Sequence, residues 1–176
     1  REKFGTQEQF QLIEGDILEF DIHHLFGAEK IKIIGNLPYH ISSPILFKLF
    51  EHRVGIDSAT IMLQKEVAER LVSAPGTKDY GILSVFCQYH CLCKKCFDIA
   101  PAAFHPKPKV DSSIVQLHFR DLPSRPRDYE FFKMVVKRSF NQRRKMLRNS
   151  LSGILEGRTI EFNLQKRPEE LTVEEF

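Results

Sequence analysis

The stretch that decides the fold is Ile31-Lys32-Ile33-Ile34-Gly35-Asn36-Leu37-Pro38-Tyr39. Its first five residues form a short, mostly apolar run, which is typical of a buried strand in a parallel sheet. A planar amide, a proline and an aromatic ring follow where that strand would end. Because open α/β sheets bind their ligands at the carboxyl ends of the strands, this stretch predicts a binding loop at residues 36–39.

The groups of this loop suit an aromatic base that carries an exocyclic amine. The lone pair of such an amine is delocalised into the ring, so two hydrogen-bond acceptors are needed to draw the nitrogen towards tetrahedral geometry. Asn36 can offer its side-chain oxygen, and Leu37 or Pro38 can offer a carbonyl in a turn that proline fixes. Tyr39 offers a face to the base. An ordinary turn explains the same four residues, because Asn and Pro are common in turns.

Other patterns along the chain predict an α/β fold. Strands are expected at Phe10–Ile13, Ala59–Leu63, Cys96–Ala100 and Ser112–Phe119, the last from its alternation of inward and outward residues. One helix is expected to start at Ser42-Ser43-Pro44 with serine as its cap, and another to follow Gln64 with Val67, Leu71 and Val72 facing inwards. A third helix is expected over Ile82–Cys91. The glycine- and proline-punctuated loop Ala74–Gly81 is expected to become ordered only on RNA.

The chain changes character after residue 121. Leu122-Pro123-Ser124-Arg125-Pro126-Arg127 is a linker candidate, with two prolines among charged residues. The spacing beyond it is helical, with apolar residues from Phe131 to Leu151, and further helices are expected at Thr159–Leu164 and after Pro168, the last still opening at Phe176. The sequence therefore predicts two domains, residues 1–121 and a small helical domain of residues 122–176.

Basic residues are concentrated near the start of the second domain. The net charge of the whole chain is +3. Between Arg120 and Arg148 ten basic residues stand against three acidic ones, a local balance of +7 that leaves −4 for the rest. A solvated helix face usually interleaves acidic partners, whereas Arg143-Arg144-Lys145-Met146-Leu147-Arg148 has none. This segment therefore favours a nucleic acid partner over a simple solvated face.

The composition is that of an ordinary soluble protein, 42% hydrophobic and 28% charged. The sequence shows neither an apolar run near the ~20 residues of a membrane span nor a signal-peptide pattern, so a cytoplasmic monomer away from membranes is expected. Four cysteines, Cys87, Cys91, Cys93 and Cys96, raise the alternative of a zinc site. Zinc sites usually pair two short cysteine-containing motifs that are separated by a longer stretch of chain. Here all four cysteines lie in one stretch whose spacing suits a buried helix face, which favours reduced thiols without a metal.

Long strings in this sequence resemble the ribosomal RNA adenine dimethyltransferase family of the KsgA type. They are Asn36–Pro44, Leu63–Val67, Phe104–Ser113 and Phe140–Leu151, in the family's order and spacing. The resemblance runs from about Gly15 to the end. It implies a Rossmann-like class I methyltransferase sheet followed by a small all-α domain. It also implies methyl transfer from S-adenosylmethionine to the N6 amine of adenines in small-subunit ribosomal RNA, twice on one nitrogen.

The resemblance and the residue types together give a set of candidate site residues. Asn36, Leu37, Pro38 and Tyr39 are the candidate catalytic residues. In the resembled family an acidic residue at the position of Asp16 accepts a hydrogen bond from the cofactor's adenine. Asp16 can equally cap the turn after it. Asn36 is the second candidate cofactor-binding residue. Phe104 is expected to stack on the base opposite Tyr39, with a plug in the core as the alternative. The candidate RNA-binding residues are Lys107, Lys109, Arg143, Arg144, Lys145 and Arg148.

One departure from the family concerns the cofactor. Its members open with a strand and a glycine-rich turn that cradles S-adenosylmethionine, and the only early glycine here is Gly5. We therefore expect the chain to begin in mid-fold and to bind the cofactor poorly by itself. Two alternative functions follow: a macrolide-resistance type of large-subunit RNA adenine methyltransferase, and a non-catalytic factor that binds ribosomal RNA during ribosome assembly.

Overall fold

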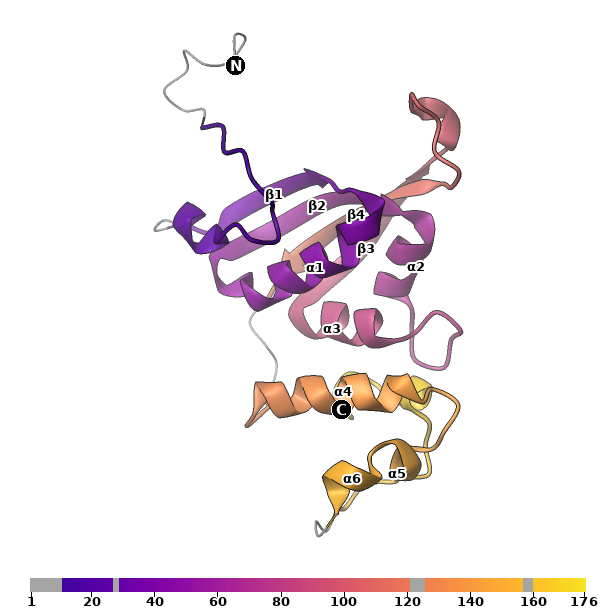
Figure 1. The fold of residues 1–176 in the computed structure, drawn as a ribbon. Helices are drawn as coiled ribbons and strands as arrows, with labels where there is room; N and C mark the ends of the chain where they lie inside the picture. The colour runs from indigo at the N-terminus through magenta and orange to yellow at the C-terminus, as the bar shows by residue number, and fades with distance from the viewer. Residues whose placement is uncertain (1–10, 27–28, 121–125, 157–159) are drawn as a thin grey trace.

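The computed structural model describes residues 11–26, 29–120, 126–156 and 160–176. A four-stranded sheet lies above three helices, and the chain then crosses to a smaller group of helices below them (Figure 1). The strands are β1 (Ile31–Asn36), β2 (Ile56–Gln64), β3 (Cys91–Ile99) and β4 (Ser112–Phe119). The α-helices are α1 (Ser42–Glu51), α2 (Lys65–Val72), α3 (Ile82–His90), α4 (Tyr129–Asn141), α5 (Leu147–Ser150) and α6 (Ser152–Leu155). Short 3-10 helices occupy Ile22–Leu25, Tyr39–Ile41, Arg53–Gly55, Pro101–Ala103 and Pro168–Glu170.

The strand order is β1-β2-β4-β3. β1 and β2 are parallel, and β4 is antiparallel to both β2 and β3. The antiparallel pair β3 and β4 closes one side of the sheet. Because β1 and β2 run in the same direction, residues 36–39 and residues 64–66 emerge at the same edge, where the open-sheet rule places ligands.

Helices α1, α2 and α3 cover one face of the sheet (Figure 1). The core between them and the sheet holds Ile61 and Leu63 of β2, Leu117 of β4, and Leu46 and Phe86 of the helices, all at most 1% exposed. In the described part of the chain the other face stays open, with the Ile34 side chain 90% exposed. Asn36 follows Ile34 by two residues and therefore points to this open face.

The predictions for β1, β2 and β4 are confirmed, but the strand predicted at Phe10–Ile13 is wrong over its described residues. Residues 11–14 form no strand, and Leu12 is 53% exposed. In the described residues the outer edge of β1 has no partner strand, so this apolar run gains no ladder of hydrogen bonds. Phe10 and Gly5 lie outside the described residues.

Three details of the predicted helices also differ. Ser42 does not cap α1 but is its first residue, because its backbone angles are already helical (φ −59°, ψ −43°); its hydroxyl donates to the carbonyl oxygen of Tyr39 at 3.0 Å. Val72 is 39% exposed rather than inward, since it is the last residue of α2 and turns off the buried face of Leu71. α3 ends at His90, so Cys91, Cys93 and Cys96 belong to β3 instead of the single helical run expected for the four cysteines.

The loop Ala74–Gly81, expected to need RNA for order, is anchored within the protein. The Tyr80 side chain is fully buried, and the backbone N–H of Gly76 donates to the carbonyl of Glu169 at 2.6 Å. In the described residues, no helix is long and apolar enough to cross a membrane.

The carboxyl-terminal region is less helical than the sequence predicts. α4 is confirmed, with the Asp128 side chain accepting from the N–H of Phe131 as an N-cap. Residues 160–164 and 171–176 are not helical, and Thr159 and most of the predicted linker lie outside the described residues. Side chains there bond to the backbone instead: Asn163 accepts from the N–H of Gln165 and Glu175 from that of Thr172. Such local bonds compete with the helix.

Candidate active site and nucleic-acid interface

A cleft of about 240 Å³ lies at the carboxyl end of β1. It brings together the candidate residues Asn36, Leu37, Pro38 and Tyr39 and, from a distant loop, Phe104. Met62, Pro106 and Pro108 complete the walls. The volume lies just below the roughly 300–1,000 Å³ of pockets for drug-sized ligands. The cleft is therefore of the size that suits one flat aromatic ring.

The side chain of Asn36 is the polar group of this cleft that is left unpaired. It is exposed and has no hydrogen-bond partner among the described residues. The backbone of Gly35 allows the loop to fold closely, because a Cβ there would lie 3.0 Å from the Leu37 side chain. The amide oxygen of Asn36 and the carbonyl of Leu37 are thus available as acceptors on one short segment. The carbonyl of Pro38 accepts from the N–H of Ile41 at 3.2 Å and keeps one lone pair for a ligand.

Tyr39 is fixed by a contact that local sequence does not reveal. Its phenol oxygen lies 2.6 Å from the hydroxyl oxygen of Ser112, at the start of β4. This bond holds the ring in a set orientation at the cleft, so the face that it offers is formed before any ligand binds. Neither Ser112 nor Met62 was among the residues that the sequence singles out.

The loop that carries Phe104 is anchored at both ends. The N–H of Lys65 donates to the carbonyl of Asp111 at 2.9 Å. Asp98, near the other end, accepts from Ser113 at 2.6 Å and pairs with Lys65 at 3.0 Å. The hydrogen bond from Ser113, followed by those from Lys95 and Lys65, holds the pKa of Asp98 well below its usual range. These contacts position the loop so that Phe104 lines the cleft.

Asp16 is not brought to the lining of the cleft. One of its carboxylate oxygens accepts from the N–H of Leu18 at 2.8 Å, and its carbonyl accepts from Glu19 and Phe20. It therefore forms the turn that the sequence offered as the alternative. Its other carboxylate oxygen has no partner in the described residues and can still accept a hydrogen bond.

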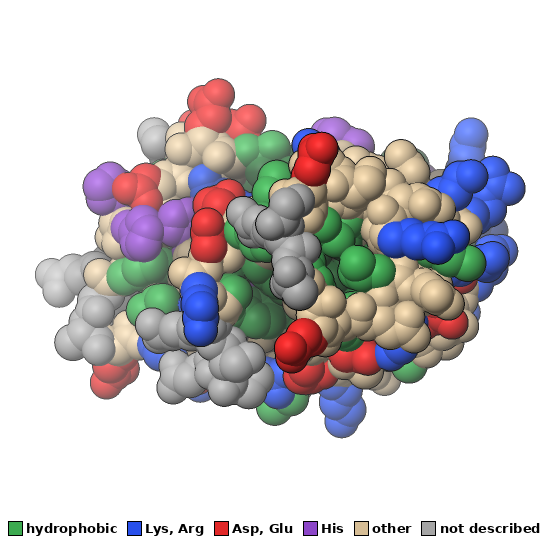
Figure 2. Space-filling model, turned by 90° about the horizontal axis from the view of Figure 1, so that it is seen from below, with side chains coloured by type: hydrophobic (Ala, Val, Ile, Leu, Met, Phe, Trp, Pro, Cys, Tyr) green, Lys and Arg blue, Asp and Glu red, His purple; other side chains and the backbone are tan. Residues whose placement is uncertain are grey.

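The basic candidates fall into two groups. Lys107 and Lys109 are exposed on the Phe104 loop, and Lys109 also lines a separate hollow of about 400 Å³ beside Lys65. Arg144, Lys145 and Arg148 are exposed and have no ion-pair partner among the described residues. Seen from below, many Lys and Arg side chains gather at the right-hand edge of the molecule and others lie along its lower side, while histidines lie at the left edge and at the top (Figure 2).

Arg143 differs from its basic neighbours. Its Nε lies 2.7 Å from Glu169 Oε2, and its Nη2 donates to the carbonyl of Thr77 at 3.0 Å. The sequence shows no acidic residue near Arg143, but the fold supplies one from the 3-10 helix Pro168–Glu170. Arg143 thus joins this helix to the loop Ala74–Gly81.

The cysteines are free; Cys87 and Cys91 are buried and Cys96 is exposed. Hydrogen bonding to Cys91, together with burial, raises the pKa of the Cys87 thiol well above its usual range. Over the described ranges, no three His, Cys, Asp or Glu residues are grouped so as to hold a metal ion.

Comparison with known proteins decides the family. Residues 1–174 match the family described as "RrnaAD: Ribosomal RNA adenine dimethylase". The chain belongs to this family. Its relatives include proteins named "Ribosomal RNA small subunit methyltransferase A" from Pseudomonas aeruginosa and Francisella tularensis subsp. novicida, each 46% identical to it. The aligned region covers 99% of this chain and 67% and 68% of those two relatives.

Solved structures of similar fold agree with this membership. A dimethyladenosine transferase from Plasmodium falciparum superposes with a TM-score of 0.71 at 24% identity, over 92% of this chain and 68% of that chain. The 23S rRNA methyltransferase ErmE gives 0.57 at 24% identity, over 90% and 67%. Both identities are low, so they support the fold alone. The Rossmann-like methyltransferase sheet and the family resemblance read from the sequence are confirmed.

Proposed function

We propose that this protein transfers methyl groups from S-adenosylmethionine to the N6 amine of adenines in small-subunit ribosomal RNA, twice on the same nitrogen, during ribosome biogenesis. The observation that carries the proposal is the cleft at β1. There an unpaired amide, Asn36, meets two aromatic rings, Tyr39 and Phe104, from segments far apart in the chain. The family membership and the relatives' names support the substrate class.

The residues present fit a role beside S-adenosylmethionine. The Asn36 amide is unpaired at the cleft, and Asp16 keeps one free carboxylate oxygen that can accept from an adenine amine. When bound, the cofactor supplies an electrophilic methyl group, which the protein itself cannot provide. Asn36 would contact the cofactor where it borders the cleft, and Asp16 would accept a hydrogen bond from the adenine amine of the cofactor.

The cleft residues then position and polarise the target amine. The Asn36 side-chain oxygen and the carbonyl of Leu37 or Pro38 accept its two hydrogens, which draws the nitrogen towards tetrahedral geometry and exposes its lone pair. Tyr39 and Phe104 hold the ring of a base taken out of its stack, at roughly 1–3 kcal/mol per stacking contact. Of the residues that line the cleft, Tyr39 is the one with a titratable side chain, and its hydroxyl is bonded to Ser112.

No strong base is needed at this site. The proton of the amine becomes far more acidic once the methyl group has been transferred, and it can then leave to water. A second transfer requires that the monomethylated amine still fits, so one acceptor position must tolerate a methyl group. A neutral side-chain amide and backbone carbonyls tolerate this better than a rigid carboxylate.

RNA phosphates are proposed to contact Lys107 and Lys109 beside the cleft, and Arg144, Lys145 and Arg148 beyond α4, which makes binding dependent on salt. We also propose the division into a methyltransferase domain, residues 1–121, and a small helical domain, residues 122–176. A second hydrophobic cluster around Leu147, Leu151 and Leu171 supports a separate core beyond α4, whereas Phe132 and Val136 of α4 pack into the main core.

Two other functions are weighed against this one. The fold of ErmE is similar, but the relatives at 46% identity are named for the small subunit, which favours the small-subunit substrate. A non-catalytic RNA-binding factor would bind RNA without S-adenosylmethionine. Calorimetric titration of the protein with S-adenosylmethionine, beside RNA binding at two salt concentrations, separates this reading from the enzyme.

The proposal is tested by Asn36→Ala in the full-length protein. Loss of one aligned polar contact to the reacting group should lower the methylation rate on the order of 100-fold or more, because Asn36 acts on the amine rather than on the RNA backbone. RNA affinity should persist. Asn141→Ala, which changes an exposed asparagine at the end of α4, is the matched control and should leave the rate unchanged. Equal rates for wild type and Asn36→Ala would refute the proposed site.

A further inference from the structure

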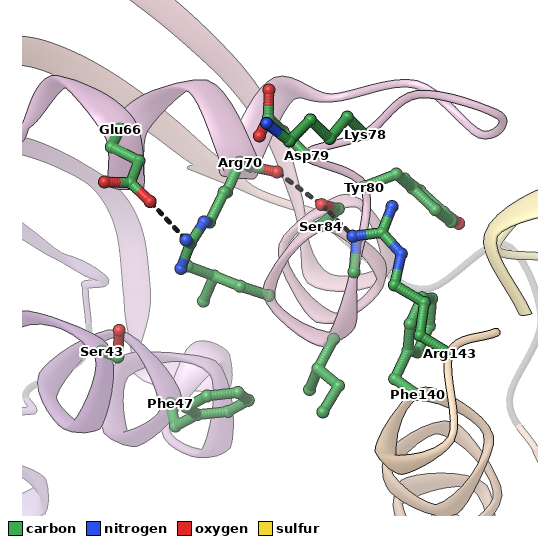
Figure 3. Close-up of a pocket in the computed structure, with 13 residues that line it drawn as sticks. Ser43, Phe47, Glu66, Arg70, Lys78, Asp79, Tyr80, Ser84, Phe140 and Arg143 are labelled. Carbon is green, nitrogen blue, oxygen red and sulfur yellow. Dashed lines mark hydrogen bonds and ion pairs between the residues drawn. The ribbon is translucent and has the colours of Figure 1, made fainter.

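A second hollow, a groove of about 740 Å³, lies between α1, α2, α3 and the end of α4 (Figure 3). None of its lining residues also lines the cleft at β1. Its volume is within the range of pockets that hold drug-sized ligands. The groove therefore has room for a ligand of its own while the cleft holds a base.

The two parts of the groove differ in character. In Figure 3, Arg70 and Lys78 lie in the upper part, with Glu66 and Asp79 beside them, whereas the rings of Phe47 and Phe140 lie lower, on opposite walls. A ligand that fits both parts carries an anionic group at one end and a flat apolar ring at the other. A nucleotide has this chemistry.

Arg70 contacts both its own helix and α3. Its guanidinium pairs with Glu66 one turn earlier on α2, and its carbonyl accepts from the hydroxyl of Ser84 at 2.5 Å. A guanidinium has five N–H donors, and the pair with Glu66 uses a single nitrogen of Arg70, so donors are left for a phosphate. Lys78 is exposed and has no ion-pair partner among the described residues.

The walls of the groove are fixed as well. Arg143 lines it while bound to Glu169 and Thr77, and the loop that carries Lys78 is tied to Glu169 through Gly76. The lining holds three cationic side chains and two acidic ones. Glu169 already neutralises Arg143, so Arg70 and Lys78 are the cations left for a ligand, which suits a single phosphate rather than the dense charge of a duplex backbone.

The groove begins close to the cleft. Ser43 lines it, and Tyr39 lines the cleft only four residues earlier. Four residues of chain span at most about 14 Å. A nucleotide that neighbours a base held between Tyr39 and Phe104 is therefore within reach of the groove.

We propose that this groove binds a second unpaired nucleotide of the RNA, with its phosphate on Arg70 and Lys78 and its base against Phe47 or Phe140. That the ligand belongs to RNA rests on the proposed function, whereas the nucleotide chemistry follows from the groove itself. The site selects RNA that has more than one unpaired nucleotide beside its target base, and so sets a requirement on the shape of the substrate.

The test uses the full-length protein and a fluorescein-labelled RNA hairpin with an adenine-containing loop, measured by anisotropy at several salt concentrations. Lys78→Gln should weaken binding and reduce the slope of log affinity against log salt by about 0.7, the value for one single-strand phosphate contact. Lys30→Gln is the matched control. It removes the same charge from another exposed lysine, just before β1 at the opposite end of that strand from the cleft.

Phe47→Leu tests the stacking part of the proposal. Leucine keeps an apolar side chain between α1 and α3, where Phe47 meets Phe86 edge-on at 5.4 Å, but it offers no ring. Affinity should fall roughly fivefold or more, with the slope against salt unchanged. The melting temperature of Phe47→Leu shows whether this variant is folded. If it is unfolded, the result for Lys78→Gln decides whether the groove binds a nucleotide.

A third measurement uses 4-thiouridine placed beside the loop adenine and crosslinked by light. Crosslinks to peptides within residues 74–84 support the groove, and crosslinks confined to residues 101–111 and 144–148 overturn it. Equal effects of Lys78→Gln and Lys30→Gln also overturn it. If Asn36→Ala leaves methylation intact while Lys78→Gln and Phe47→Leu still weaken RNA binding, the proposed catalytic site is wrong and the groove proposal stands. If Asn36→Ala abolishes methylation while the two groove variants bind RNA like wild type, only the groove proposal is rejected.

Discussion

Arg143 is predicted to stabilise the fold rather than to bind RNA, although it lies in the most basic run of the chain. Its guanidinium bridges Glu169 and the carbonyl of Thr77, whereas the neighbouring Arg144 is exposed without a described partner. Substituting each arginine by glutamine removes the same charge one position apart. The pair of variants therefore separates a structural arginine from a phosphate-binding one.

The expected loss of stability follows from the two contacts. The ion pair is partly exposed, 36% for Arg143 and 27% for Glu169, so it contributes about 1 kcal/mol rather than the larger value of a buried pair. The hydrogen bond to Thr77 adds about 1 kcal/mol. Arg143→Gln should then lower the melting temperature by roughly 4–8 °C in a chain of this size. Glu169→Gln removes the ion pair alone and should cost about half as much, and Arg144→Gln should stay within about 0.5 kcal/mol of wild type.

Thermal unfolding, hydrogen exchange and salt-dependent RNA binding together check this prediction. Arg143→Gln should also speed exchange of the Gly76 amide, which donates to the carbonyl of Glu169. Arg144→Gln should reduce the slope of log affinity against log salt by about 0.7, and Arg143→Gln should leave it unchanged. A reduced slope for Arg143→Gln at an unchanged melting temperature would show that Arg143 binds phosphate, and the structural assignment would be wrong.

Two further predictions concern pH. Burial lowers the pKa of His90 to about 3, so below pH 6.5 the unfolded chain binds a proton that the folded protein does not bind. Between pH 6 and 4, the free energy of unfolding of wild type, measured in urea, should fall by up to about 1.4 kcal/mol per pH unit relative to that of His90→Phe. Parallel plots of this free energy against pH for the two proteins would contradict the prediction. The bonds from Ser113, Lys95 and Lys65 keep the pKa of Asp98 below its ordinary 3.8, so its stabilising effect is present above that pH and is lost below it. Asp98→Asn should therefore melt lower than wild type at pH 7, and the difference should shrink as the pH falls below 4; a difference that stays constant to pH 2 excludes the carboxylate as its source.

Much of the sheet could be predicted because its strands carry their own signals. The alternation over Ser112–Phe119 reproduces β4 at both ends, since a strand buried on one face must place its apolar residues two apart. The run from Ile31 predicts β1 for a related reason. The binding loop after it follows from the general rule on strand ends, so Asn36 and Tyr39 could be named as site residues without coordinates.

Other parts depend on partners that lie far along the chain. β3 starts at Cys91 rather than Cys96 because it pairs with β4 from Cys91 opposite Phe119 to Ile99 opposite Ser112, with a register shift between Lys95 and Phe97. The bond between Tyr39 and Ser112 has no local signal for the same reason. Arg143 shows the same dependence on the fold, since its acidic partner Glu169 lies far along the chain and the basic run around Arg143 gives no sign of it.

The cleft also explains why the chemistry proposed here needs so few special residues. Its acceptors are a neutral amide and backbone carbonyls, which are weak groups individually, and their effect depends on orientation. That orientation is supplied from outside: Ser112 fixes the ring of Tyr39, and the contacts of Lys65 with Asp98 and Asp111 fix the loop of Phe104. Because those partners sit on β4, α2 and the end of β3, the geometry of the cleft is set by the packing of the whole sheet edge. A substitution at Asp98 should therefore disturb the cleft indirectly, through the loop, while the loop Asn36–Tyr39 keeps its own conformation.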